Sequence, residues 1–177
     1  ENGWASLVLG FNATIPANVE VYTVSEATKT KAELELVAEV VPANEAVLVK
    51  AGKGNYAFDY TKAEGNVTSN LLEGSLFNKS VNEGAYVLAE VNGNVGLYSA
   101  TLTDGTFQNK ANKAYLPATA VPAGARFLSF DFGTETAIES IEGENGNVKA
   151  EIYDLAGRRV QNAQKGLYIV NGKKVIK

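Results

Sequence analysis

Apolar and polar residues alternate along most of this chain, with the period of two that half-buried β-strands show. The clearest alternating segments are residues 4–9, 19–24, 32–41, 46–50, 56–60, 85–91, 94–100 and 126–132. Gly, Asn and Pro separate these segments at a spacing of roughly ten residues, which is typical of sandwiches and barrels. The pattern predicts an all-β fold: an antiparallel β-sandwich or jelly-roll-like body, with a small antiparallel β module at the C-terminus.

Several turns are predicted from residues that tolerate a positive φ. Asn92-Gly93 stands between two alternating segments and predicts a β-hairpin with a type I′ turn. Thr103-Asp104-Gly105 predicts another turn. An apolar-Pro-Ala-(Asn or Gly) motif precedes a strand three times, at residues 15–18, 41–44 and 121–124. We interpret the motif as a recurrent way to begin a strand, rather than as three equivalent binding loops.

Residues 31–41 are compatible with two structures. They contain good helix formers between Thr30 and Pro42, so a short helix is one alternative. However, apolar residues alternate there with polar ones, and we favour a strand with Glu33, Glu35 and Glu39 on a solvated face.

The composition excludes several kinds of chemistry. The chain has no Cys, no His and no Met. A disulfide, a thiolate nucleophile, a Ser-His-Asp triad and a Cys or His metal site are therefore impossible. Residues 104–106 and 142–147 offer oxygen atoms to a calcium ion, but they do not fit the EF-hand spacing, and ordinary turns explain them better. We expect no metal, no cofactor and no catalytic residues; a small hydrolase that uses carboxylates alone is the remaining enzymatic alternative.

Charge is distributed unevenly along the chain. The formal net charge is −4, of which residues 148–177 carry +5 and the remainder −9. An acidic body argues against nucleic-acid binding. The basic residues of the tail alternate with apolar ones, as on a solvated strand face. No apolar run approaches the length of a membrane-spanning helix, so we expect no transmembrane segment.

The composition also predicts a domain boundary. Residues 134–146 are acidic, polar and end in glycine, as linkers do. The sequence therefore divides into a β-sandwich accessory domain (residues 1–133), an acidic linker (134–146) and a C-terminal β module (147–177). No basic-then-apolar leader follows Glu1, and we expect any signal peptide to lie outside this chain.

The C-terminal module carries a specific resemblance. Residues 148–160 and 165–177 read VKAEIYDLAGRRV and KGLYIVNGKKVIK. They resemble the C-terminal sorting domain of the type IX secretion system, found on secreted and surface proteins of Bacteroidetes. No Pro-Asn-Pro segment precedes Thr134, so the module resembles a shortened form of that domain. The resemblance implies recognition by the outer-membrane secretion machinery through Gly157, Arg158, Arg159, Gly166, Tyr168, Lys173 and Lys174.

The body resembles a β-domain that often precedes this tail in large surface proteins of the same bacteria. The residues that carry the resemblance are 3–7, 15–22, 41–44, 70–75, 86–88, 96–98 and 112–116. It implies a secreted or cell-surface location and a non-catalytic accessory role, but no particular ligand.

Carbohydrate binding is the alternative function, because exposed aromatic rings beside amides recognise sugars. The candidate ligand-binding residues are Tyr56, Tyr60 and Trp4. Alternation places Tyr56, Phe58 and Tyr60 on one face of a strand, which is either a core stripe or a binding platform; we favour the core. On this alternative, the body is a carbohydrate-binding or adhesin module for a glycan or a host surface protein.

Overall fold

The computed structural model describes residues 2–133, 152–153, 167–170 and 173–176. The chain forms two compact units, residues 1–132 and 133–177. The predicted linker at 134–146 lies outside the described residues.

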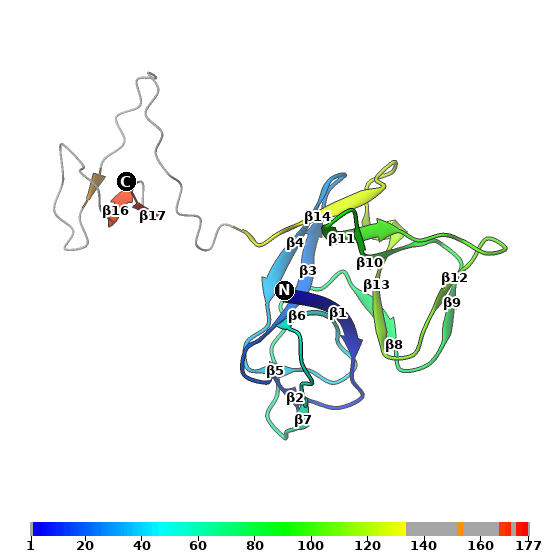
Figure 1. The fold of residues 1–177 in the computed structure, drawn as a ribbon, viewed down its shortest axis with the longest axis horizontal. Coiled ribbons are helices and arrows are strands. Elements are labelled where there is room, and N and C mark those ends of the chain that lie inside the picture. Colours follow the sequence, from blue (N-terminus) through cyan, green and yellow to red (C-terminus); the bar gives the residue numbers. More distant parts are fainter. Residues whose placement is uncertain (1, 134–151, 154–166, 171–172, 177) are drawn as a thin grey trace, which may run out of the picture. The chain divides into compact units, whose positions relative to one another are not determined.

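A nine-stranded sheet dominates the first unit (Figure 1), with the strand order β1-β6-β3-β4-β14-β11-β10-β13-β8. Neighbouring strands are antiparallel except β4 and β14, which run parallel. The strands are β1 (Asn2–Val8), β3 (Val19–Ala27), β4 (Lys31–Leu36), β6 (Ala46–Gly52), β8 (Glu73–Ser75), β10 (Ala85–Val91), β11 (Asn94–Ser99), β13 (Lys113–Pro117) and β14 (Phe127–Asp131).

Two small sheets and one short helix complete this unit. One sheet has the order β5-β2-β7, and the other pairs β12 with β9. Their bounds are β2 (Ala13–Thr14), β5 (Val40–Val41), β7 (Asp59–Tyr60), β9 (Lys79–Val81) and β12 (Phe107–Asn109), and the 3-10 helix is η1 (Ala118–Ala120). The predicted all-β, sandwich-like fold is confirmed.

The large sheet curls until its first strand returns to β13, so that it is nearly barrel-like. The Val8 N–H donates to the carbonyl of Asn112 at 3.2 Å, and the Ala114 N–H donates to Ser6 Oγ at 3.3 Å. These bonds join the two ends of the sheet. They involve only the C-terminal half of β1.

Strand alternation produces two apolar layers. Ala46 and Leu48 of β6 belong to a core cluster enclosed by the large sheet, together with Tyr86 and Leu97. Val47 points to the opposite face of β6. It belongs to a second cluster, which includes Val21 of β3 and Val41 of β5. The period of two in the sequence thus fills both faces of the same strand.

The body contains the same topological unit twice. Strands β1-β6-β3-β4 recur in the same order as β8-β13-β10-β11. The register also agrees, because Val8 pairs with Ala46 as Gly74 pairs with Ala114. In each copy a small strand follows the first strand of the unit: β2 in the first copy and β9 in the second.

Matching hydrogen bonds support this equivalence. Asn12 Oδ1 accepts the Ala43 N–H at 2.8 Å, and Asn78 Oδ1 accepts the Ala111 N–H at 3.0 Å. Each asparagine follows a phenylalanine in the sequence. We therefore treat residues of the two copies as structurally equivalent.

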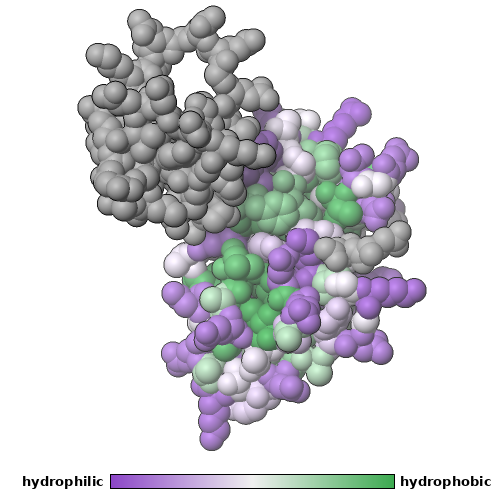
Figure 2. Space-filling model, turned by 60° about the vertical axis from the view of Figure 1, so that its left-hand side comes forward, coloured by the Kyte–Doolittle hydropathy of each residue, from purple (hydrophilic) through white to green (hydrophobic). Residues whose placement is uncertain are grey.

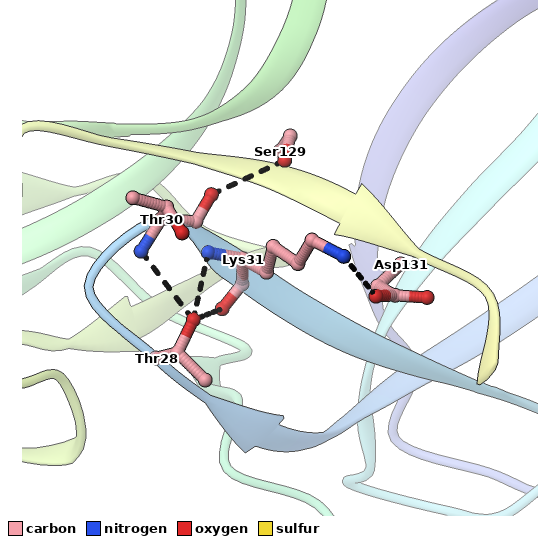
Figure 3. A network of polar contacts seen from close by, with 5 residues as sticks. All are labelled: Thr28, Thr30, Lys31, Ser129 and Asp131. Carbon is pink, nitrogen blue, oxygen red and sulfur yellow. Dashed lines mark hydrogen bonds and ion pairs between the residues drawn. The ribbon is translucent and has the colours of Figure 1, made fainter. Parts of the chain in front are cut away.

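The copies are joined where β4 and β14 run parallel (Figure 3). Lys31 Nζ lies 2.8 Å from Asp131 Oδ2, and this carboxylate raises the pKa of Lys31. The Ser129 N–H and Oγ donate to the carbonyl of Thr30 at 2.9 and 3.1 Å. Thr28 Oγ1 accepts the N–H groups of Thr30 and Lys31, which holds the β3–β4 turn beside β14.

The predicted turns have the expected backbone conformation. Asn92 and Gly93 have φ of 52° and 80° between β10 and β11, as a type I′ turn requires. The three Pro-Ala motifs and the turn near residue 104 also place a residue at positive φ. These residues are Asn18 (63°), Asn44 (64°), Gly124 (88°), Asp104 (50°) and Gly105 (77°).

Residues 31–36 form strand β4, so the helical alternative was wrong. Glu33 and Glu35 are exposed, as predicted, while Ala32 and Leu34 are buried. The strand ends earlier than expected. Glu39 adopts a φ of 56°, which breaks the extended run before β5.

The described part of the second unit is a three-stranded antiparallel sheet, β15-β16-β17. Its strands are β15 (Ile152–Tyr153), β16 (Leu167–Val170) and β17 (Lys173–Ile176). Within the described parts of the chain, no helix has the length and hydropathy needed to cross a membrane.

Candidate functional site

Four aromatic rings meet where β1, β3 and β14 lie close together. The Trp4 ring centroid is 4.6 Å from that of Phe130, 5.8 Å from that of Tyr22 and 6.3 Å from that of Phe132. Tyr22 and Phe132 pack edge to face at 5.5 Å. We call Trp4, Tyr22, Phe130 and Phe132 the aromatic cluster. Trp4 and Phe130 pack against the core enclosed by the sheet, whereas Phe132 is 48% exposed.

One ion pair borders the aromatic cluster. Lys50 Nζ lies 2.6 Å from Glu20 Oε2, and 6.0 and 5.6 Å from the ring centroids of Trp4 and Phe132. The Tyr22 hydroxyl donates to the same Glu20 oxygen at 3.0 Å. The hydrogen bond from Lys50 lowers the pKa of Glu20, and burial, followed by the hydrogen bond to Glu20, raises the pKa of Tyr22 to about 12.

This shift predicts a loss of stability in alkali. The Tyr22 pKa is raised from 10.0 to about 12, so the folded state favours the neutral phenol. The contribution of this raised pKa to the free energy of unfolding is complete below pH 10.0 and is lost as the pH rises toward about 12. The loss is on the order of 2–3 kcal/mol. Denaturant unfolding across this range measures it, and Tyr22→Phe, which cannot ionise, should lose less. Equal losses in both proteins would show that ionisation of Tyr22 does not cause the alkaline loss of stability.

A pocket of about 510 Å³ lies next to Trp4, which we call the seam pocket. It is bounded by β1 on one side and β10 on the other, with β12, β13 and the chain between them completing the wall. The lining residues are Trp4, Ala5, Ser6, Val87, Leu88, Phe107, Gln108, Asn109, Lys110, Lys113 and Ala114.

The pocket exists because β13 separates β1 from β10 over only part of their length. β13 pairs with β10 at Ala85 and Tyr86 alone, and it begins at Lys113. Beyond that point no described strand pairs with β10 on the side of β13, and β1 pairs only with β6. Two strand edges therefore face a gap that no described strand fills.

The polar groups of the lining differ in how well they are satisfied. Gln108 accepts from Ser80 Oγ at 3.0 Å and donates to Thr106 Oγ1 at 3.1 Å. Asn109 is 2% exposed and donates to the carbonyl of Lys113 at 2.9 Å. These amides hold the β12–β13 connection in place. Among residues 2–133, Lys110 and Lys113 form no ion pair, and both are exposed.

The structure does not assemble the three predicted aromatic residues into one site. Trp4 lines the seam pocket. Tyr60 is 67% exposed on β7, with its ring centroid 6.3 Å from that of Phe11. The Tyr56 hydroxyl donates to the carbonyl of Gly52 at 3.1 Å.

The core interpretation of these tyrosines was wrong. Of residues 56–60, only Asp59–Tyr60 belong to a strand, so residues 56–60 do not share one strand face. Phe58 packs against the second core cluster, while Tyr56 remains 38% exposed. The ladder from β2 to β7 is too short to align all three rings.

The predicted sorting residues belong to the second unit. Tyr168 pairs with Val175, and Lys173 and Lys174 pair with Val170 and Ile169. The remaining predicted residues, Gly157, Arg158, Arg159 and Gly166, lie outside the described residues.

Apolar surface is not confined to the seam pocket. Figure 2 shows apolar residues in green near the middle of one face, bordered by hydrophilic ones. The large exposed apolar residues come from many elements: Phe11, Leu36, Tyr56, Tyr60, Phe77, Val91, Leu102 and Phe132. We assign no common site to them.

Sequence reasoning missed most of the seam pocket. Ser6, Leu88, Lys110 and Lys113 come from distant parts of the chain, and only the barrel-like closure brings them together. A usable signal was present in Lys110 and Lys113, which flank the turn at Asn112. No group of three or more acidic residues that could hold a metal ion occurs in the described part of the chain.

Comparison of the chain with known protein families, curated proteins and solved structures gives no match.

Proposed function

We propose that this chain is a non-catalytic accessory region of an exported bacterial surface or secreted protein, ending in a sorting module. Two observations support the proposal. The chain separates into two compact units near the predicted boundary. The described strands of the second unit form an antiparallel sheet that contains Tyr168, Lys173 and Lys174, three residues of the sorting resemblance.

Removing residues 147–177 is expected to abolish surface delivery of a reporter that carries this chain, in a bacterium with a type IX secretion system. Lys173→Glu with Lys174→Glu should reduce delivery, because strand recognition would lose its positive charges. Lys29→Glu with Lys62→Glu changes two exposed lysines of the body and is the matched control. Surface-exposed reporter is measured by protease accessibility on intact cells. Undiminished delivery after the deletion would exclude the export role.

The body has a second candidate function as an adhesin or carbohydrate-binding module. The specific observation is the seam pocket, which combines the single tryptophan with two exposed lysines. The volume lies within the range of ligand sites, and the lining combines apolar side chains with hydroxyl, amide and ammonium groups.

A glycan array separates the two aromatic candidates for sugar binding. If the seam pocket binds a sugar, Trp4→Ala should abolish the signal, whereas Tyr56→Ala with Tyr60→Ala should leave it unchanged. The reverse result would move the site to the exposed tyrosines. Circular dichroism of each variant checks that the fold is retained.

A further inference from the structure

We infer that the seam pocket binds an extended peptide segment of a partner protein, by strand addition between β1 and β10, with an acidic side chain beside Lys110 and Lys113. The inference rests on the adhesin function proposed for the body and names its ligand class. It is independent of the export role of the second unit.

The first support is the direction of the main-chain groups of β1. The Val8 N–H points away from β6, because it donates to Asn112. Main-chain groups alternate between the two sides of a strand, so those of Trp4 and Ser6 point the same way as the Val8 N–H. They face the gap between β1 and β10, which we call the seam. Within the described residues, no backbone partner meets them there.

The same alternation applies to β10. The carbonyl of Ala85 accepts from Ala100 on the β11 side, so the main-chain groups of Tyr86 and Leu88 face the β13 side. On that side Tyr86 pairs with Leu116, whereas Leu88 has no backbone partner on the β13 side among the described residues. An extended chain between β1 and β10 would find free donors and acceptors on both sides.

The second support comes from the internal duplication. Tyr22 pairs with Leu48 in the first copy as Tyr86 pairs with Leu116 in the second, so Val24 is the equivalent of Leu88. The main-chain groups of Val24, unlike those of Leu88, have hydrogen-bond partners. Its carbonyl accepts the Leu71 N–H at 2.7 Å, and its N–H donates to Asn70 Oδ1 at 3.3 Å.

The protein therefore fills one of two equivalent seams with its own chain. Residues 69–71, which lead into β8, occupy the seam beside β3, and the Ser69 hydroxyl also donates to the carbonyl of Ser25. In the other copy, β1 continues along β6 to Asn2 and does not bond to β10. The geometry that accepts an extended segment thus recurs, and none of the described segments of the chain pairs with β1 and β10 there.

Charge favours an acidic ligand. Lys110 and Lys113 line the seam pocket, and no carboxylate is among the lining residues. Glu90 lies two residues beyond Leu88 on β10, toward the hairpin. An acidic side chain is therefore expected on the side of the lysines. A peptide backbone would also form hydrogen bonds with the main-chain groups of Trp4, Ser6 and Leu88. A sugar would pair with these groups less completely.

The test is a selection from a random-sequence peptide library on the whole chain, counter-selected against Ser6→Pro. Proline at residue 6 removes a donor that faces the seam and leaves the β1–β6 ladder intact, because edge strands tolerate it. Ser6→Ala also loses the hydroxyl but keeps the donor, and is the matched control. Fluorescence of Trp4, the single tryptophan, reports binding at the pocket.

We expect the selected peptides to be extended, acidic and bound by the wild type and Ser6→Ala, but not by Ser6→Pro. Methylating one seam-facing peptide N–H should weaken binding about tenfold, a typical cost of one lost hydrogen bond. Lys110→Glu with Lys113→Glu, which changes only exposed side chains, should weaken it by about the same factor.

Two outcomes would overturn the inference. One is a selection without enrichment, or selected peptides whose N-methylated and unmodified forms bind the protein equally well. The other is glycan binding that requires Trp4 while no peptide binds, which would keep the adhesin function and reject the ligand class. Loss of the export role alone would leave the inference unaffected.

Discussion

Gly74→Ala is expected to destabilise the body by about 2–3 kcal/mol, because this position has no room for a methyl group. An alanine Cβ would overlap Val8 Cγ2 and lie 2.9 Å from the carbonyl oxygen of Lys113. Val8 is 2% exposed and belongs to the main core cluster. Gly74 therefore sets how closely β1 approaches β8 and β13 where the sheet closes. Denaturant unfolding monitored by tryptophan fluorescence measures the loss.

Gly3→Ala is the matched control, since its Cβ would meet only the carbonyl of Ala51 at 3.9 Å. It should change the free energy of unfolding by no more than about 0.5 kcal/mol. Combining Gly74→Ala with Val8→Ala should cost less than the sum of the two single changes, because Val8→Ala removes the methyl group that the new Cβ at residue 74 would overlap. Simple additivity would show that the closure is looser than described.

Asn70→Leu should cost about 3 kcal/mol or more, the largest effect expected of a polar side chain in the body. Its Nδ2 donates to the carbonyl of Ala46 and to Glu45 Oε1, both at 2.8 Å. Its Oδ1 accepts the N–H groups of Val24 and Leu72 at 3.3 and 3.0 Å. Leucine has a similar shape but leaves these half-buried groups without partners. Thermal and denaturant unfolding measure the effect.

Asn78→Leu provides the comparison for this prediction. Asn78 is exposed, and its Oδ1 accepts one main-chain N–H, that of Ala111. Its loss should cost about 1 kcal/mol. Asn70→Asp keeps both acceptor bonds but places a carboxylate against Glu45, so it should also destabilise, less at acidic pH than at neutral pH. Equal costs at Asn70 and Asn78 would show that residues 69–71 are not held as described.

The local structure of the body was predictable because it depends on short-range chemistry. Asn92-Gly93 specifies its own hairpin, since both residues accept positive φ at little cost. The motif at residues 41–44 likewise places Asn44 at a φ of 64° just before β6. Alternation identified β4 as a strand even though its residues are good helix formers, because burial of Ala32 and Leu34 outweighs helix propensity.

The candidate site was not predictable, because pairing between distant segments creates it. No spacing in the sequence shows that, among the main-chain groups of Trp4, Ser6 and Val8, only the Val8 N–H bonds to the segment before β13, or that β13 pairs with only two residues of β10. The duplication is only partly visible in the sequence. The two copies share the Phe-Asn pairs at residues 11–12 and 77–78 and an Ala-Asn-x-Ala-x-Leu run at residues 43–48 and 111–116, but few other equivalent strand positions carry the same residue. Topology and register reveal what the residue types do not.

Native-state hydrogen exchange of single amides, followed by NMR, tests most directly whether one seam is filled and the other open. Val24 and Leu88 occupy equivalent positions, and the Val24 N–H donates to Asn70 Oδ1 at 3.3 Å. An open seam predicts that the Leu88 amide exchanges at least about tenfold faster than the Val24 amide, because the cost of exposing a donor depends on its bond. Binding of a selected peptide should then protect Leu88 and leave Val24 unchanged. Equal protection of both amides in the free protein would contradict the open seam.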